Sequence, residues 1–192
     1  MVIVGGGRRG VGRMASAACV GGLLLGAAGC TAAPKPAPPS PTPTITPIFA
    51  SDEEALAAAT EAYANYQNMS DQIDSEGGID PERIAPFVSA SLLPTAVHQS
   101  DGFREAGARS VGSTTFLVAG TQELSYASLD EIAISLYICD DVSEVDVLDE
   151  NGSSLVSEIR DSVTPFEVGF VLNSDEALIV DSRDVWQGKS FC

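Results

Sequence analysis

The sequence of this 192-residue chain predicts an α+β fold in which N-terminal helices pack against a curved antiparallel sheet. Two observations predict it. Apolar residues recur at spacings of three and four in the earlier part of residues 51–192, and they alternate with period two in the later part. The hydrophobic fraction of 44% supplies a core, and at roughly 150 residues per domain the length allows one domain with extra segments.

The first helix is expected to begin after Ser51, because Ser51-Asp52-Glu53-Glu54 forms a capping box. An apolar stripe then runs along one face to about Met69, through Leu56, Ala59, Tyr63 and Tyr66. Glu61 falls between stripe positions, so we expect it on the solvent side. It is the kind of carboxylate that burial could turn into a proton-transfer group.

Two shorter helices are expected next. Asp80-Pro81-Glu82 predicts a helix start, with Asp80 as the cap and proline in the first turn. A third helix is expected from Ser91 to Ala106, broken or bent near Pro94.

After Gly112 the pattern changes to strands. Asn151-Gly152 predicts a hairpin turn between two of them. The expected strands are Thr115–Val118, Glu131–Cys139, Val145–Leu148, Leu155–Ile159, Phe166–Leu172 and Ala177–Val180.

Residues 1–29 are predicted to be an export signal. Three arginines precede an uncharged stretch of sixteen residues, Met14 to Gly29, which is shorter than the roughly 20 residues of a membrane span. The small residues before Cys30 resemble the lipobox of bacterial lipoproteins, although Ala27 stands where that family prefers Leu. The resemblance implies that Cys30 takes a diacylglycerol and becomes the acylated N-terminus. The alternative is an ordinary secretory peptide cut nearby.

Residues 30–50 are predicted to be a disordered linker that follows the lipidated cysteine. Residues 31–50 hold seven of the eleven prolines, which favours extended polyproline II. The composition also suits O-glycosylation. A ligand for a proline-reading module is the alternative. Residues 51–192 form the expected folded domain.

The charge of the chain excludes one class of partner. The formal charge is −17, and removal of the signal would leave 27 acidic and 7 basic residues, so a nucleic-acid partner is not expected. Anionic lipid heads would repel such a domain. We therefore expect it to be held at the extracytoplasmic face of the cell membrane by its N-terminal lipid.

The order of several modest motifs resembles the nuclear transport factor 2-like, cystatin-like cone fold, and more narrowly the lipid-anchored secreted proteins of actinobacteria that carry it. The resemblance covers residues 51–192. It depends on Cys139-Asp140-Asp141, Leu148-Asp149-Glu150-Asn151-Gly152 and the closing segment from Val185 to Cys192. Trp186 departs from the pattern, because many relatives place a Trp in a Trp-x-Val strand.

Cys139 and Cys192 are expected to form a disulfide. They are the two thiols left in an oxidising compartment once Cys30 is acylated and Cys19 is removed with the signal. A redox or metal role needs a nearby His or second Cys, and the local sequence holds neither.

The sequence assigns no catalytic residue, metal or cofactor. The acidic run from Asp140 to Glu150 invites comparison with a calcium loop, but Val147 stands at the first ligand position, so a solvated acidic hairpin is expected instead. His98 is the single histidine and is expected at the surface or a helix end.

Two functions remain. One is a non-enzymatic envelope lipoprotein whose domain binds a small ligand or an envelope protein, or scaffolds a neighbour. The other is a small-molecule isomerase, cyclase or dehydratase, since such enzymes share this cone. An inward-facing aspartate beside His98 or Tyr66 would favour the enzyme, whereas an aliphatic or filled interior would favour binding.

Overall fold

A computed structural model describes residues 47–127 and 132–192. The chain divides into two units, of which the second, Pro43–Cys192, contains all the described residues. The expected signal peptide (1–29), the lipidation site Cys30 and most of the linker lie outside the described residues. Within the described part, no helix is both long and apolar enough to cross a membrane.

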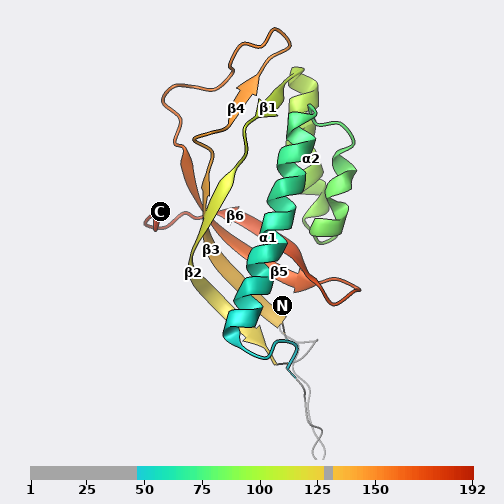
Figure 1. The fold of residues 1–192 in the computed structure, drawn as a ribbon, viewed down its shortest axis with the longest axis vertical. Coiled ribbons are helices and arrows are strands. Elements are labelled where there is room, and N and C mark those ends of the chain that lie inside the picture. Colours follow the sequence, from blue (N-terminus) through green and yellow to red (C-terminus); the bar gives the residue numbers. More distant parts are fainter. Residues whose placement is uncertain (1–46, 128–131) are drawn as a thin grey trace, which may run out of the picture. The chain divides into compact units, whose positions relative to one another are not determined.

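The second unit is an α+β domain, which confirms the predicted fold class (Figure 1). Its four-stranded antiparallel sheet has the order β2-β3-β5-β6, and a separate two-stranded ribbon pairs β1 with β4. The elements in chain order are α1 (Asp52–Ser75), the 3₁₀ helix η1 (Pro81–Phe87), α2 (Leu93–Ala106), β1 (Arg109–Val111), β2 (Thr115–Tyr126), β3 (Ile132–Asp141), β4 (Asp146–Leu148), β5 (Val163–Leu172) and β6 (Leu178–Val185).

Helix α1 begins where the capping box predicts. The Ser51 hydroxyl accepts a hydrogen bond from the Glu54 amide at 3.3 Å, while the Glu54 carboxylate accepts one from the Ala50 amide at 2.7 Å. The helix continues to Ser75, beyond the expected end near Met69, because its buried face extends as far as the fully buried Ile73. Glu61 is exposed, as expected.

The next two helices differ in detail from the prediction. Asp80 precedes η1 in a left-handed conformation, with φ of 50°, and its side chain makes no capping hydrogen bond. Pro94 lies in the first turn of α2 instead of bending it, because the amide that proline lacks has no helical partner at that position. The expected helix therefore starts at Leu93 instead of Ser91.

One face of the sheet carries the core and packs against α1, which crosses it obliquely (Figure 1). Period-two alternation places side chains of β3 and β5 on this inner face. The buried ones are Ile134, Leu136, Ile138, Phe166, Val168 and Phe170. From α1, Ala55, Ala59 and Tyr63 meet this face and are all 0% exposed.

The expected hairpin around Asn151-Gly152 forms its turn and a single antiparallel bridge, between Leu148 and Ser154. The Asp149 carboxylate accepts hydrogen bonds from the amides of Asn151 and Ser153, both at 2.8 Å. Residues 155–159 form no strand, and the main partner of β4 is β1, a strand that the sequence patterns did not predict. The turn was therefore predicted correctly, but the second strand of the predicted hairpin does not form.

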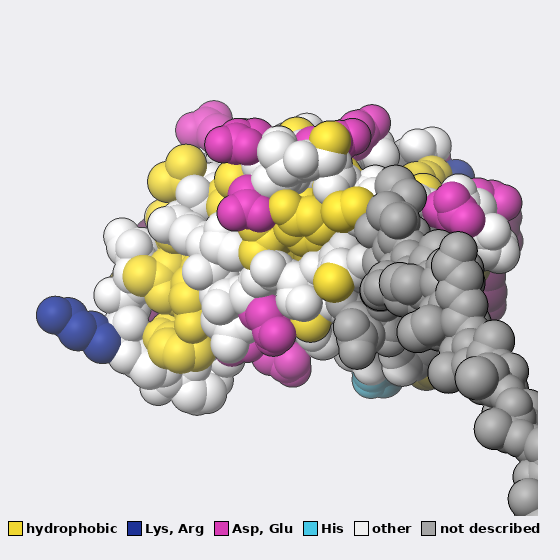
Figure 2. Space-filling model, turned by 90° about the horizontal axis from the view of Figure 1, so that it is seen from below, with side chains coloured by type: hydrophobic (Ala, Val, Ile, Leu, Met, Phe, Trp, Pro, Cys, Tyr) yellow, Lys and Arg dark blue, Asp and Glu magenta, His cyan; other side chains and the backbone are white. Residues whose placement is uncertain are grey.

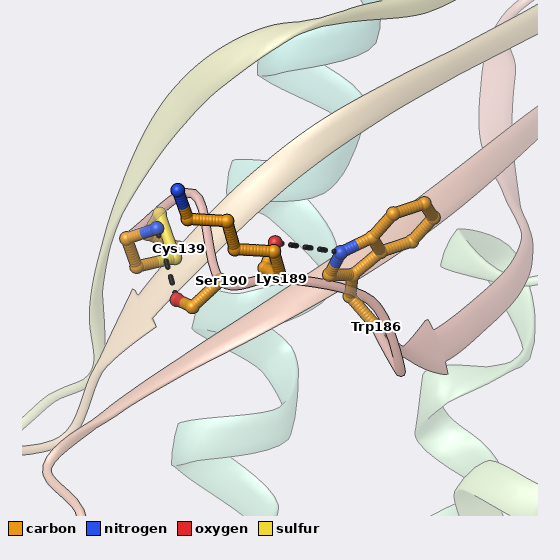
Figure 3. Close-up of a disulfide and its surroundings, with 5 residues drawn as sticks. Cys139, Trp186, Lys189 and Ser190 are labelled. Atoms are coloured by element: carbon orange, nitrogen blue, oxygen red, sulfur yellow. Dashed lines mark hydrogen bonds between the residues drawn. A yellow bond between two sulfur atoms is a disulfide. The ribbon is translucent and has the colours of Figure 1, made fainter.

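The C-terminal segment is tied to the outer face of the sheet. Cys139 and Cys192 form the expected disulfide, with Cα atoms 5.8 Å apart (Figure 3). The indole of Trp186 donates a hydrogen bond to the Lys189 carbonyl at 3.1 Å. The ring of Tyr137 on β3 lies 5.2 Å from that of Trp186. These contacts hold residues 186–192 against β3.

Candidate functional site

A polar cavity of about 280 Å³ opens beside the C-terminal half of α1. Its wall comes from the α1 residues between Tyr66 and Asp74, from Gln99 of α2, from Thr114 before β2, and from β3, β5 and β6 near Asp140, Phe166 and Arg183. Segments from both halves of the domain therefore meet here. Such a cavity is near the lower end of the usual range for small-molecule sites, which begins at about 300 Å³.

Asp140 carries the most buried charge of this site. It is the next inner-face position of β3 after Ile134, Leu136 and Ile138, and it is 2% exposed. Its Oδ2 accepts a hydrogen bond from the Tyr63 hydroxyl at 2.7 Å and pairs with Arg183 at 2.6 Å. Its Oδ1 is buried and has no hydrogen-bond partner among the described residues.

Arg183 reaches the inner face through a β-bulge. Val180 pairs with Phe170 and Ser182 with Gly169, so Asp181 is the extra residue that shifts the alternation of β6. Arg183 consequently lies opposite Val168, on the inner face. Without the bulge, Ser182 would face the core instead.

The Arg183 guanidinium is held from several sides. Besides the pair with Asp140, its Nε donates to the Tyr63 hydroxyl at 3.0 Å. Its Cζ lies 3.5 Å from the centre of the Phe166 ring, a cation–π geometry. Because a guanidinium keeps its proton in proteins, this charge is permanent.

The two tyrosines beside this pair keep their protons. Burial raises the pKa of Tyr63 far above its ordinary value, and the pKa of Tyr66 is raised for the same principal reason, with Asp140 and Asp74 adding to the effect. Tyr63 therefore acts as a hydrogen-bond donor to Asp140 and not as a base.

Two further carboxylates of α1 line the cavity. Asp71 accepts hydrogen bonds from the amide and hydroxyl of Thr114 at 2.8 and 2.9 Å, and Asp74 accepts one from the Ser100 hydroxyl at 2.7 Å. Burial raises the pKa of both carboxyls, and these hydrogen bonds only partly oppose it. For Asp74, the neighbouring Asp71 raises the pKa further.

The structure corrects the interpretation of the acidic run. Asp140 was expected in a solvated hairpin, but it is buried and ion-paired, because the alternation of β3 continues one step further than expected. Asp149 lies in its own turn, as described above. Among the described residues, no group of three or more His, Cys, Asp or Glu side chains is arranged to hold a metal ion.

His98 lies on an exposed face of α2 and takes no part in the cavity. The cavity was missed because its residues come from distant segments. The one signal that pointed to it was the alternation of β3, which places Asp140 on the same face as three buried aliphatic residues.

The fold and the cavity define an α+β domain with a buried ion pair at the wall of a polar cleft. No protein-family model matches the chain, and no curated protein matches it. Two solved structures from Catenulispora acidiphila are similar. The first is 16% identical to this chain, with a TM-score of 0.45, and the match spans 69% of this chain and 93% of the other. The second, in complex with S-DNPA, is 16% identical and covers 67% and 92%, with a TM-score of 0.42.

Proposed function

We propose that this chain is a lipoprotein of the extracytoplasmic membrane face, attached through lipid on Cys30, whose α+β domain binds a small polar ligand without converting it. The observation that supports binding is the wall of the cavity, where the carboxylates of Asp71 and Asp74 and the guanidinium of Arg183 converge. A concave site lined by a few convergent polar groups is the usual form of a small-molecule site.

The inner wall of the cavity supports binding over catalysis. The carboxylate of Asp140 is engaged by Arg183 and by the hydroxyl of Tyr63, which itself stays protonated. General acid–base catalysis needs a group that exchanges its proton near the working pH. The guanidinium charge of Arg183 is permanent and the Tyr63 hydroxyl keeps its proton, so these two groups can orient a ligand but do not exchange protons with it.

Retention of a small molecule tests the binding proposal. The full chain, purified gently from its own envelope, should release a bound small molecule on denaturation, detected by mass spectrometry. Ser70 lines the cavity from α1, so Ser70→Tyr should fill it and abolish retention. Ser125→Tyr, on β2 outside the cavity wall, is the control. Equal retention by both variants would contradict binding in this cavity.

The lipid attachment has its own test. Mass spectrometry of the mature protein should find a diacylglyceryl-modified Cys30 as the first residue, and Cys30→Ser should leave unprocessed precursor or soluble protein. An unmodified N-terminus downstream of Cys30 would contradict the lipoprotein assignment.

One observation favours the enzyme as a second candidate. Burial raises the pKa of Tyr66, and the nearby carboxylates of Asp140 and Asp74 raise it further. An inward-facing aspartate beside Tyr66 is the feature that would favour an enzyme. Asp74 has a raised pKa and a wall position in the cavity, as a general base would. Isomerase, cyclase or dehydratase turnover that Asp74→Asn abolishes would replace the binding proposal with this one.

A further inference from the structure

The charges in the cavity are unbalanced. Asp140 is neutralised by Arg183 at 2.6 Å, and Arg183 is the single cationic side chain among the wall residues that the structure describes. Asp71 and Asp74 face the same space with hydrogen bonds from neutral groups alone. Two half-buried negative charges therefore lack a counter-charge within the described wall.

Burial makes this imbalance costly. A carboxylate withdrawn from water loses hydration, and a second carboxylate nearby adds repulsion. Both effects act on Asp74, whose pKa is raised first by burial and further by Asp71. A positively charged group in the cavity would relieve both, whereas an anion would meet the same repulsion.

The acidic surface of the domain also favours a positively charged ligand. Figure 2 shows Asp and Glu side chains spread over the end of the domain where α1 begins, with few Lys or Arg. The chain carries 27 acidic against 10 basic residues. Such a surface raises the local concentration of cations and repels anions.

The arrangement of the carboxylates selects among cations. Asp71 and Asp74 are three residues apart on α1, so their side chains leave the same helix face about 5–6 Å apart. Each already has its own hydrogen-bond donor, and no metal-type cluster of acids is found among the described residues. Separated, partly satisfied carboxylates suit a ligand whose N–H donors are spread over several atoms better than one compact ion.

We propose that the cavity beside α1 binds a small organic cation bearing amino groups, with Asp74 and Asp71 as its counter-charges. This inference depends on the proposed binding function and names its ligand class. The volume of about 280 Å³ limits the ligand to a few carbon atoms and its polar groups.

Isothermal titration of the full chain in detergent tests the ligand class. The probes are 1,4-diaminobutane, the uncharged 1,4-butanediol of similar length, succinate and calcium chloride. The diamine should bind, and the diol and succinate should not. Asp74→Asn should weaken diamine binding about tenfold, the expected loss for one hydrogen bond to a charged group. Thermal unfolding of this variant checks that it is folded.

Asp184→Asn is the matched control. Asp184 neighbours Arg183 on β6, is exposed and does not line the cavity, so the variant removes the same charge without touching the wall. Its affinity for the diamine should equal that of the unmodified chain. An equal loss in both variants would overturn the site, since only net charge would then matter.

Other outcomes separate this inference from the proposed function. Binding of the diol or succinate, lost in Ser70→Tyr, would overturn the cation class and leave a small-ligand function standing. Calcium binding that displaces the diamine would replace the organic cation with a metal ion. No binding of the diamine would overturn the inference, and if the chain also retains no molecule from the envelope, the binding function fails with it.

Discussion

Replacing Arg183 by Met tests how much the buried ion pair between β6 and β3 stabilises the domain. The side chains of Arg183 and Asp140 are 18% and 3% exposed. Arg183→Met keeps an unbranched apolar side chain beside Phe166 but leaves Asp140 with the Tyr63 hydroxyl as its single partner among the described residues. Breaking a buried pair in this way costs about 3–5 kcal/mol, because an uncompensated charge stays buried. Domains of this size have about 5–15 kcal/mol in total, so the variant should be marginally folded.

Urea denaturation at pH 7 measures this loss, and a double-mutant cycle assigns it. Asp140→Asn alone leaves the Arg183 charge buried, whereas the double variant Asp140→Asn with Arg183→Met removes both charges. The double variant should therefore be destabilised by less than the sum of the singles, with a coupling of about 0.5–3 kcal/mol. Strictly additive losses, or a loss below about 1 kcal/mol in Arg183→Met, would refute the reasoning.

Three further predictions concern stability. Cys192→Ser should lower the free energy of unfolding by about 4 kcal/mol in urea, because the disulfide closes a loop across 53 positions, and the reduced unmodified chain should match it. Asp74→Asn should be more stable than the unmodified chain at pH 7, because burial raises the pKa of this carboxyl. The difference in the free energy of unfolding should shrink as the pH falls, because the unmodified carboxyl then takes up its proton. A difference that does not change with pH would contradict this explanation. Gly78→Ala should lower the free energy of unfolding by more than about 1 kcal/mol, because φ is +72° and a Cβ would lie 2.0 Å from the Ser100 carbonyl oxygen. Gly102→Ala, in open space within α2, should instead raise the free energy of unfolding by about 0.5–1 kcal/mol, measured by thermal unfolding.

Local patterns predicted the elements whose stability is local. The cap at Ser51 and the stripe through Tyr63 place α1 correctly at its start, because capping and amphipathic burial act within a few residues. The disulfide between Cys139 and Cys192 was predicted from the expected oxidising compartment and the count of thiols. Both depend on information that lies in the sequence itself.

The cavity depends on register between distant strands, which local patterns do not carry. Arg183 lies in a polar run that looks like a loop, and it faces inward only because Asp181 forms a bulge against β5. Asp140 was placed among solvated acids, since its partner lies 43 residues further along the chain. Strand β1 was missed because three residues give too short a pattern to recognise.

Two adjacent residues of β3 distinguish its native register from a register shifted by one residue. Cys139 faces outward to the disulfide, and Asp140 faces inward to its ion pair. A slip of one residue would reverse the faces, turning the thiol toward the core and the carboxylate toward the tail. The disulfide between Cys139 and Cys192 therefore forms readily only when the sheet is correctly paired. Once formed, the disulfide prevents β3 from shifting to another register. If the chain is exported as proposed, oxidation in that compartment would retain the sheet in its native register.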